Sequence, residues 1–531
     1  MHFPLPNSPV TRNTGADQNQ CSEAPGTRYL SSGEPARGTW LSTIVVCLMV
    51  ATMLALFWFP LKRTFANVEV NYNEGWNTYR AAMVAKGIPL YGGRPHGFGN
   101  PTAYPPISFH LVSWLGTANT FTVIGRCVSL ISLMTTGVFV GLIVRRAGAS
   151  WQMAAFSFLL YEIGIALLRP DRIGMNDPQL LAEALSTAGL YFYFRNPDSK
   201  HLLCVSALLF CLAGFTKQNL IVFPAAVAID LLFRSLRAFA VWAGAMVLSA
   251  GLLTAMTLSV DGRYFFQHLM SGGGRGYSFW VAWSNYHHYV EIFQGLLVIA
   301  TAWSICAFRT RKVFVSAFVL SYVLAFLLAG GSGVDLNIFF NALAATAMAC
   351  GIALSDFSFV PTGSRSAFLN STAALKFAVF FISIMIFVPG QLRRNREQLR
   401  LLPARVREFN SAAELLKTRP GPALCESHLL CYEAGKPFEY EPFSVQQQLK
   451  AGVLHEEDIL QLLRTHHFQT IEVALRADEQ NLSEGDLRMS LTSDQKEPDK
   501  QRRFGPKFMN ELLAEYQLSM RTSEMALFCP R

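Results

Sequence analysis

The stretch that decides the fold of this chain begins with Asn73-Glu74-Gly75-Trp76-Asn77 and ends with Tyr104-Pro105-Pro106. It is polar and aromatic and carries a carboxylate, yet apolar runs lie on both sides of it. The run before it, from Leu41 to Pro60, has no charged residue and approaches the roughly 20 residues that a helix needs to cross a bilayer. A stretch this polar between two spans predicts a loop at the membrane surface, over residues 61–120.

The composition is that of a polytopic helical membrane protein. Hydrophobic residues make up 51% of the 531 residues and charged residues only 15%, which is too little charge to cover the surface of a soluble protein of this length. The net charge of +9 comes largely from short Lys and Arg clusters between apolar runs. Such clusters are typical of helix-flanking anchors at lipid headgroups, so we expect a membrane partner and no nucleic acid.

Ten further apolar runs follow the first, so about eleven spans are expected. They are Phe121–Val144, Trp151–Leu168, Gln179–Phe194, Leu202–Phe215, Leu220–Phe233, Phe239–Leu258, Val290–Phe308, Val313–Ala329, Ile338–Leu354 and Leu375–Pro389. Residues 1–38 are polar and rich in Pro, Gly, Ser and Thr, which predicts a disordered cytoplasmic tail. The membrane domain is expected over residues 39–392.

The distribution of Lys and Arg predicts the orientation. Four clusters fall on one side of the span count and mark the cytoplasm: Arg145-Arg146, Arg195 with Lys200, Arg234 with Arg237, and Arg309 with Arg311-Lys312. Lys62 and Arg63 argue the other way but are outnumbered. The first loop, the turn at 169–178, the loop at 262–289, the corner Lys217-Gln218-Asn219 and the turn at 330–337 are then together on the outer face.

The prolines of Tyr104-Pro105-Pro106 fold the first loop back onto the membrane, because consecutive prolines cannot continue a helix and hold the preceding residue extended. The apolar run Ile107–Leu115 is too short to span and predicts a juxtamembrane helix at the interface. Irregular backbone at this depth is tolerated where it lines a cavity, so we expect a cavity beneath the loop.

In their order along the chain, several short motifs resemble those of the C-type (GT-C) membrane glycosyltransferases, which include the protein mannosyltransferase and aminoarabinose transferase groups. The motifs are Glu74-Gly75-Trp76-Asn77, Ile88-Pro89-Leu90-Tyr91, Tyr104-Pro105-Pro106, Gly125-Arg126 with Ser129, Arg169-Pro170-Asp171, Phe215-Thr216-Lys217-Gln218, Gly333-Val334-Asp335-Leu336-Asn337, and Gly435-Lys436-Pro437 through Tyr440-Glu441-Pro442-Phe443. One departure concerns the loop acid. Many relatives have Asp-Glu or a lone Asp there, whereas Asn73 precedes Glu74 here.

The resemblance implies transfer of a sugar from a polyprenyl-phosphate donor to a lipid, glycan or protein acceptor on the extracytoplasmic face of a bacterial inner membrane. Glu74 would be the general base that takes the acceptor proton. Outer-face cations would hold the departing phosphate. The expected donor-binding residues are Lys217, Arg169, Arg172, Arg263 and Arg275, together with Asp171, Tyr104 and Gln218. The plainer alternative is that Glu74 solvates a loop and the cations anchor helices. No cofactor or metal site is predicted.

Two acids inside predicted spans, Glu162 and Glu183, are a second cluster. Intramembrane acids are costly and usually face a cavity or a partner. They are expected either to pair with Arg169, Arg172 or Lys217 and so orient the phosphate, or to form a structural ion pair within a helical hairpin.

The loop at 262–289 contains Gly272-Gly273-Gly274, two tryptophans and the pair His287-His288. No acid or Cys lies at ligand spacing from these histidines, which argues against a metal site. A mobile lid over the donor site is the preferred interpretation of this loop.

From residue 393 onward the composition changes to that of a small soluble α/β domain. Helical patterns at Val406–Lys417, Glu456–His466 and Lys507–Tyr516 alternate with strand-like segments at Pro422–Glu426, Thr470–Leu475 and Met525–Cys529. Cys425 and Cys431 are close enough in sequence for a disulfide in an oxidising compartment, although Cys529 leaves other pairings open. The domain is expected to cap the membrane site or to receive the acceptor.

A transporter or lipid flippase is the alternative from another functional class. It would also be polytopic, but it should show internal repeats with interrupted helices in matching halves. No such repeat is visible in the sequence. An enzyme of the kind proposed should have an outward cavity beneath the first loop, whereas a transporter should have a pathway at the bilayer midplane.

Overall fold

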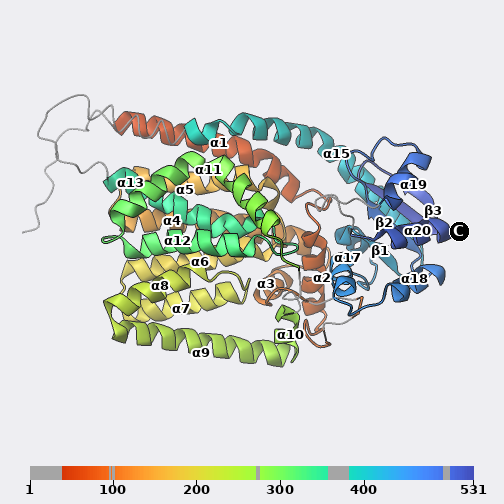
Figure 1. The fold of residues 1–531 in the computed structure, drawn as a ribbon, viewed down its shortest axis with the longest axis horizontal. Coiled ribbons are helices and arrows are strands. Elements are labelled where there is room, and N and C mark those ends of the chain that lie inside the picture. Colours follow the sequence, from red (N-terminus) through yellow and green to blue (C-terminus); the bar gives the residue numbers. More distant parts are fainter. Residues whose placement is uncertain (1–38, 95–96, 99–101, 271–275, 357–381, 494–502) are drawn as a thin grey trace, which may run out of the picture.

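The protein is described by a computed structural model, which covers residues 39–94, 97–98, 102–270, 276–356, 382–493 and 503–531. A long helical body carries a small α/β module at one end (Figure 1). The fold class predicted from the sequence is confirmed. The predicted tail 1–38, residues 375–381 of the last predicted span, the glycines Gly272–Gly274 and Arg275 lie outside the described residues.

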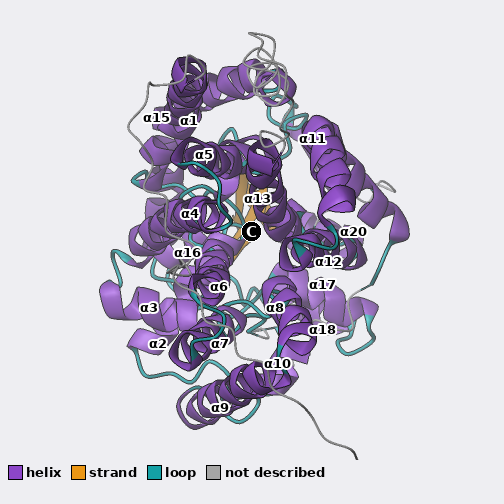
Figure 2. Ribbon diagram, turned by 90° about the vertical axis from the view of Figure 1, so that its left-hand side faces the viewer, coloured by secondary structure: helices purple, strands orange, loops and turns teal. Residues whose placement is uncertain are grey.

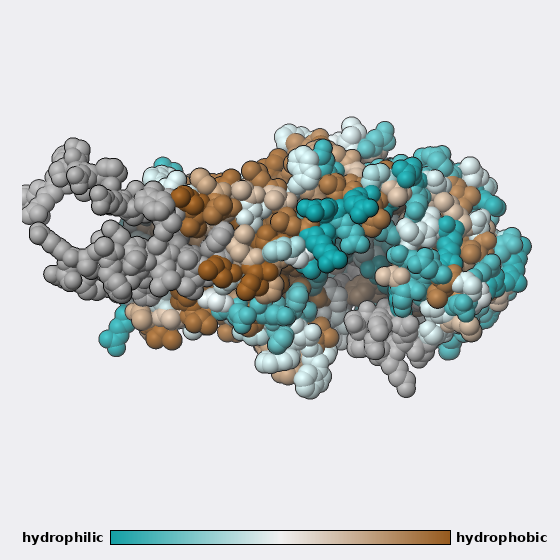
Figure 3. Space-filling view, turned by 90° about the horizontal axis from the view of Figure 1, so that it is seen from above, coloured by the Kyte–Doolittle hydropathy of each residue, from teal (hydrophilic) through white to brown (hydrophobic). Residues whose placement is uncertain are grey.

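Each predicted span from Leu41–Pro60 to Ile338–Leu354 coincides with a helix. These helices are α1 (Thr39–Thr64), α4 (Phe121–Arg146), α5 (Trp151–Leu168), α6 (Pro178–Arg195), α7 (Lys200–Gly214), α8 (Val222–Arg234), α9 (Leu236–Val260), α11 (Phe279–Ala307), α12 (Lys312–Leu328) and α13 (Phe340–Asp356). Among the described residues, six are long and apolar enough to cross a membrane: α1, α4, α5, α9, α11, and α13 with the short helix η3 (Leu336–Phe339) before it. Hydrophobic surface is concentrated over this body (Figure 3).

The helical body is organised around α13, which lies at its centre when viewed end-on (Figure 2). Small residues let its neighbours approach closely. A Cβ added to Gly351 of α13 would lie 1.9 Å from Ser157 Oγ of α5, and one added to Gly164 of α5 would lie 2.8 Å from the Leu343 side chain. Helix α9, in contrast to the buried α13, exposes most of its apolar side chains, as lipid-facing residues would be.

The loop between α1 and α4, which we call the first outer loop after its predicted side, contains two helices, α2 (Asn73–Ala85) and α3 (Ile107–Leu115). Helix α3 has the bounds predicted for the juxtamembrane helix. Helix α2 was not predicted: the stretch from Asn73 to Asn77 was interpreted as loop, but it forms the first turn of a helix that is buried from Glu74 to Ala82. Tertiary contacts with α16 and α4 supply this burial, which a local sequence pattern does not reveal.

The predicted loop at 262–289 is also largely helical, and this expectation was wrong. It contains α10 (Phe265–Met270) and the first part of α11, so His287 and His288 lie on a helix. His288 faces Glu291 one turn on, with 4.0 Å between His288 Nδ1 and Glu291 Oε2. Within the part of the chain that the structure describes, no group of three or more candidate ligands surrounds a potential metal position.

The C-terminal module follows the long helix α15 (Val388–Thr418) and contains a four-stranded sheet in the order β1-β2-β4-β3. The strands are β1 (Ala423–Cys425), β2 (Thr470–Ala474), β3 (Tyr516–Arg521) and β4 (Met525–Pro530); β1 and β2 are parallel and the other pairs antiparallel. The helices are α16 (His428–Glu433), α17 (Pro442–Lys450), α18 (Glu456–Arg464), α19 (Glu484–Thr492) and α20 (Pro506–Glu515). Strand β3 was missed. Cys425 and Cys431 form a disulfide.

The module docks on the first outer loop through α16 and α2. The fit at Gly75 is so close that an added Cβ would lie 2.0 Å from the backbone N of Leu429. The Tyr79 hydroxyl donates to the Lys436 carbonyl at 2.8 Å, and the Tyr432 hydroxyl donates to the Ala118 carbonyl at 2.7 Å. The disulfide bridges β1 and α16, so it holds the docking helix against the sheet.

Candidate functional site

Two cavities of about 330 Å³ and 370 Å³ lie between the first outer loop and the turns that join the membrane helices. We call the first the outer cavity, because the C-terminal module forms one of its sides, and the second the inner cavity, because the turns between membrane helices and the ends of these helices form most of its wall. They share one wall, which consists of Asn73, Ala103, Tyr104, Arg172, Gly333 and Asp335. The predicted cavity beneath the first loop is therefore present, in two compartments.

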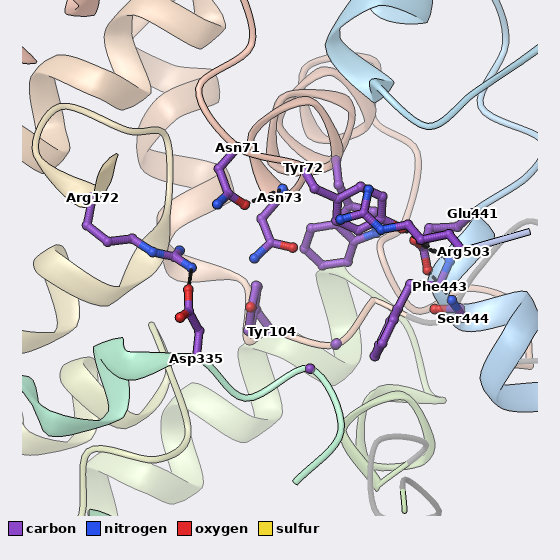
Figure 4. Close-up of a pocket in the computed structure, with 13 residues that line it drawn as sticks. Asn71, Tyr72, Asn73, Tyr104, Arg172, Asp335, Glu441, Phe443, Ser444 and Arg503 are labelled. Atoms are coloured by element: carbon purple, nitrogen blue, oxygen red, sulfur yellow. Dashed lines mark hydrogen bonds and ion pairs between the residues drawn. The ribbon is translucent and has the colours of Figure 1, made fainter. Parts of the chain in front are cut away.

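The outer cavity has an aromatic and amide lining. Asn71, Tyr72, Asn73 and Trp76 line it from the first loop, and Glu441, Phe443, Ser444 and Arg503 line it from the module (Figure 4). Trp76 meets Tyr104 edge-on, with 5.4 Å between the ring centroids. The Arg503 guanidinium lies over the Tyr72 ring, 3.3 Å from its centroid. Such a lining suits a polyhydroxylated ligand, because rings stack on sugar faces and amides bond hydroxyls.

The inner cavity combines cations with an apolar wall. Lys217, Gln218 and Asn219 lie beside the apolar residues Leu269, Leu327, Leu328, Val334 and Ile338. Lys217 lies over the Tyr104 ring at 4.9 Å. Gln218 Nε2 donates to the Ala103 carbonyl at 3.0 Å. Three residues predicted as donor-binding, Lys217, Gln218 and Tyr104, are thus brought together.

A network of three cations and three carboxylates runs along the shared wall. Arg172 Nη1 donates to Asp177 Oδ2 at 3.0 Å, and Arg172 Nη2 donates to Asp335 Oδ2 at 2.6 Å. Arg169 donates to Asp335 and, through two nitrogens, to Asp171. Lys217 Nζ lies 3.6 Å from Asp177 Oδ1. The predicted cluster of Arg169, Arg172, Asp171 and Lys217 therefore exists, and it has two further acids.

The turn that carries Arg169 and Arg172 is held by the end of α1. Arg63 Nη2 donates to the carbonyls of Pro170, Asp171 and Ile173, at 3.3, 3.0 and 2.8 Å. Arg63 is buried and is not the headgroup anchor that the sequence suggested. Burial alone would raise the pKa of the Asp171 carboxyl, but the Arg169 bonds and nearby guanidinium charges outweigh it and lower that pKa. Asp171 is therefore an ionised partner that holds Arg169 in place.

Glu74 does not lie where the sequence predicted. Its side chain has no exposed surface, and it lines neither cavity. Arg126 of α4 donates to both carboxylate oxygens, at 2.7 Å from Nε and 2.6 Å from Nη2. The backbone N–H groups of Val70 and Asn176 donate to it as well, at 2.9 and 3.1 Å. The expectation of a cavity-facing Glu74 within reach of the Arg169 turn or Lys217 was wrong.

The sequence feature that could have predicted this pairing is the position of Arg126. An arginine five residues into an apolar span needs a partner in the protein, and the buried loop acid supplies it. Arg126 also donates to the Ala66 and Val68 carbonyls, both at 2.6 Å. Together these bonds tie α4 to the loop segment between α1 and α2.

Three other predicted residues are not part of the wall. Arg263 is exposed, and its described contacts are with its neighbour Tyr264. Glu183 accepts from Gln179 Nε2 at 2.8 Å and has no ion pair among the described residues. Both oxygens of Glu162 are buried without a hydrogen-bond partner in the described part of the chain. Neither pairing expected for these two acids, with an outer-face cation or within a hairpin, is present.

The residues of the site that were not predicted as site residues include Asn73, Asp335, Glu441 and Arg503. Asp335 was detectable as an acid in an outer turn between two spans. Glu441 caps α17, because its carboxylate accepts from the backbone N–H of Phe443 at 3.1 Å and of Ser444 at 2.6 Å. Burial raises the pKa of Glu441, and these bonds oppose the rise. Nothing local identified Arg503, which reaches the cavity only through the fold of the module.

A buried histidine lies behind the outer cavity. His428 Nε2 is 3.7 Å from Glu441 Oε1, and the ring contacts Tyr72 and Phe438. Burial, assisted by the charges of Arg503 and Arg80, lowers the pKa of His428 to about 3. The imidazole is therefore neutral at physiological pH and packs as part of the docking interface.

A helical membrane body, a first outer loop with two helices and a C-terminal α/β module docked on that loop are the features of the C-type (GT-C) fold that the sequence predicted. The solved structures that share this fold include two of ArnT from Cupriavidus metallidurans. The one bound to undecaprenyl phosphate has a TM-score of 0.55, 12% sequence identity and coverage of 93% of this chain and 98% of that chain. The apo structure has a TM-score of 0.54, 14% identity and coverage of 92% and 98%. No protein-family description and no curated protein matches this sequence.

Proposed function

We propose that this protein is a membrane glycosyltransferase that moves a sugar from a polyprenyl-phosphate donor to an acceptor on the extracytoplasmic face. The observation that carries the proposal is the pair of cavities with a shared wall. One cavity is apolar and cationic, the other is aromatic and polar, and the charge network lies between them. A sugar passing from a lipid phosphate to an acceptor requires such an arrangement.

The inner cavity is the proposed donor site. We propose that its leucines contact the first isoprenoid units and that Lys217 and Arg172, which also line it, hold the phosphate. Cations at the leaving phosphate stabilise the negative charge that develops as the glycosidic bond breaks. The ArnT structure that shares this fold is described as bound to undecaprenyl phosphate, which supports a lipid phosphate as the donor class.

The outer cavity is the proposed site for the sugar and the acceptor. Trp76 and Tyr72 line it with aromatic rings, and Asn71 and Asn73 offer amides for hydroxyl groups. The C-terminal module forms one side of this cavity, so its proposed role is to position a lipid, glycan or protein acceptor.

Glu74 has contacts that favour a positioning role. Proton abstraction by Glu74 would require its pair with Arg126 to break in a fully buried site, and leaving a buried charge unpaired costs several kcal/mol. We therefore propose that Glu74 and Arg126 set the start of α2, so that Asn73 and Trp76 face the outer cavity. General-base action by Glu74 stays a prediction.

The proposed location is the bacterial inner membrane, with residues 393–531 outside. The Lys and Arg clusters support this orientation. The Cys425–Cys431 disulfide supports it independently, because disulfides persist mainly in oxidising compartments such as the periplasm.

The test is sugar transfer by purified protein in nanodiscs, with undecaprenyl-phosphate pentoses and hexoses as donors and cell-envelope extract as the acceptor source. Lys217→Ala should weaken donor use by roughly ten- to hundred-fold, which corresponds to one lost charge-assisted hydrogen bond. Arg263→Ala is the matched control, since it removes an exposed cation that lines neither cavity. Equal effects of both variants, or no transfer with any donor, would contradict the proposed function.

A further inference from the structure

We propose that Asp335 is the general base of the transfer and that the donor phosphate frees it for this role. This inference rests on the proposed function. It addresses a problem that the site poses: the position facing the outer cavity from the first turn of α2 is Asn73, which cannot take a proton, and the neighbouring acid Glu74 is buried against Arg126.

Three acids at or near the two cavities are candidates for the general base: Glu441, Asp177 and Asp335. Glu441 lines the outer cavity, but its two oxygens cap the N-terminus of α17. Asp177 is buried between Arg172 and Lys217 and lines neither cavity. Asp335 lines both cavities, and its side chain is 25% exposed. Among the described acids it is therefore the one in reach of both substrates.

In the structure Asp335 is fully engaged. Oδ2 accepts from Arg172, while Oδ1 accepts from Arg169 and from the backbone N–H of Leu336. A carboxylate whose oxygens are taken by two guanidinium groups is poorly able to accept a proton. Oδ2 of Asp335 can accept a proton only after the Arg172 guanidinium has found another anion.

The donor phosphate is that anion. Guanidinium groups bind phosphate with the same two-pronged geometry that they use for carboxylate. Arg172 lines the inner cavity, so a phosphate held there by Lys217 meets the guanidinium that now holds Asp335. Exchange of one anion for the other leaves Asp335 on the wall of the outer cavity, as Figure 4 shows for its present position beside Tyr104.

The turn that carries Asp335 also contacts the acceptor side. Gly333 has a φ of +78°, and a Cβ added there would lie 2.6 Å from the Phe443 ring of the C-terminal module. Phe443 lines the outer cavity. The position of Asp335 is therefore fixed from both the membrane helices and the module.

The step balances without a further reactant. The acceptor hydroxyl oxygen attacks the anomeric carbon, and the bond between that carbon and the phosphate oxygen breaks. The electron pair of that bond stays on the phosphate, which leaves as polyprenyl phosphate held by Arg172 and Lys217. The hydroxyl proton passes to the Asp335 carboxylate and then to solvent through the outer cavity.

Two measurements on Asp335→Asn test the inference, both in nanodiscs. Binding of undecaprenyl phosphate should become several-fold tighter, because the competing anion is gone. Transfer should fall by roughly 10²–10⁴-fold, as for a lost general base, and the acidic limb of the pH–rate profile should disappear. If Asp335 had only a structural role, the variant would lose undecaprenyl phosphate binding and sugar transfer together, and the acidic limb of its pH–rate profile would remain.

Asp171→Asn is the matched control. It also removes an anion from Arg169, but Asp171 lines neither cavity, so the acidic limb should remain. If Asp335→Asn does not fold, Asp335→Glu carries the test, because it keeps the charge and misplaces the base by about 1 Å. Its transfer should fall by roughly 10²-fold with donor binding nearly unchanged.

Weaker undecaprenyl phosphate binding by Asp335→Asn, or a wild-type rate in either Asp335 variant, would overturn the inference. Failure of the proposed function is a separate result: the wild-type protein would neither bind undecaprenyl phosphate nor transfer sugar.

Discussion

Two carboxylate–guanidinium pairs in this protein are chemically alike but differ in solvent exposure and in their position relative to the cavities. Glu74 and Arg126 form a closed pair, with side chains 0% and 1% exposed, that joins α2 to α4. Asp335 and Arg172 form a pair on the wall of two cavities, where the carboxylate side chain is 25% exposed and shared with Arg169. We propose that the closed pair holds structure, whereas the open pair can exchange its anion for a substrate phosphate.

The largest expected effect is loss of the closed pair. Arg126→Ala leaves Glu74 buried and unpaired, which should lower the free energy of unfolding by about 3–5 kcal/mol. Thermal unfolding in detergent measures it. The double variant Arg126→Met with Glu74→Leu should recover much of the loss, since it removes both charges; no recovery would show that the carbonyl contacts of Arg126 dominate.

The docking of the C-terminal module depends on the close approach at Gly75. Gly75→Ala places a methyl group against the Leu429 backbone, an overpacking that should cost about 1–3 kcal/mol. We expect faster proteolysis of the module and a loss of transfer through the displaced wall of the outer cavity. Gly87→Ala is the control for the loop, since no atom lies within 4 Å of its added Cβ, although its φ of +67° adds local strain. If Gly75→Ala and Gly87→Ala changed proteolysis and transfer equally, disturbed docking of α16 would not be the cause.

Stability of the module should depend on pH through Glu472. Burial, with the charge of Glu426, raises the pKa of Glu472 to about 8, while its carboxylate accepts from the Ser427 N–H at 2.8 Å. The folded state therefore binds a proton that the unfolded state has released between pH 4.5 and about 8, so stability falls as pH rises through this window. Glu472→Gln should raise the Tm by a few degrees at pH 8.5 and leave it unchanged at pH 4. The same Tm difference at both pH values would contradict the assignment.

The smallest expected effect is at the rim of the outer cavity. Arg503→Ala removes a guanidinium stacked on Tyr72, which should raise the KM for the acceptor about 2- to 5-fold, in line with a cation–π contact of roughly 0.5–1 kcal/mol, with little change in kcat. Arg503→Lys should recover part of the affinity. A change in donor binding, measured with undecaprenyl phosphate, would place Arg503 at the other substrate.

Much of the fold was readable from the sequence. The spans from Leu41–Pro60 to Ile338–Leu354 follow from apolar length, because a bilayer accepts only segments that satisfy their own backbone and expose apolar side chains. The helix Ile107–Leu115 follows from the prolines before it. The cluster of Arg169, Arg172 and Lys217 follows from counting which turns share a side of the membrane.

What only the tertiary structure decided is where each polar side chain points. Adjacent residues of a helix differ by about 100° in direction, so Asn73 lines the cavities while Glu74 turns inward to Arg126. The sequence determined that a polar first loop lies on a membrane body. The contacts of α16 with α2 and of α4 with the loop, between residues far apart in the chain, decided that α2 is a helix. The bonds of Arg169 and Arg172 to Asp335 hold this acid on the wall of both cavities. Such contacts depend on complementary surfaces that form only when the chain has folded, and no local pattern encodes them.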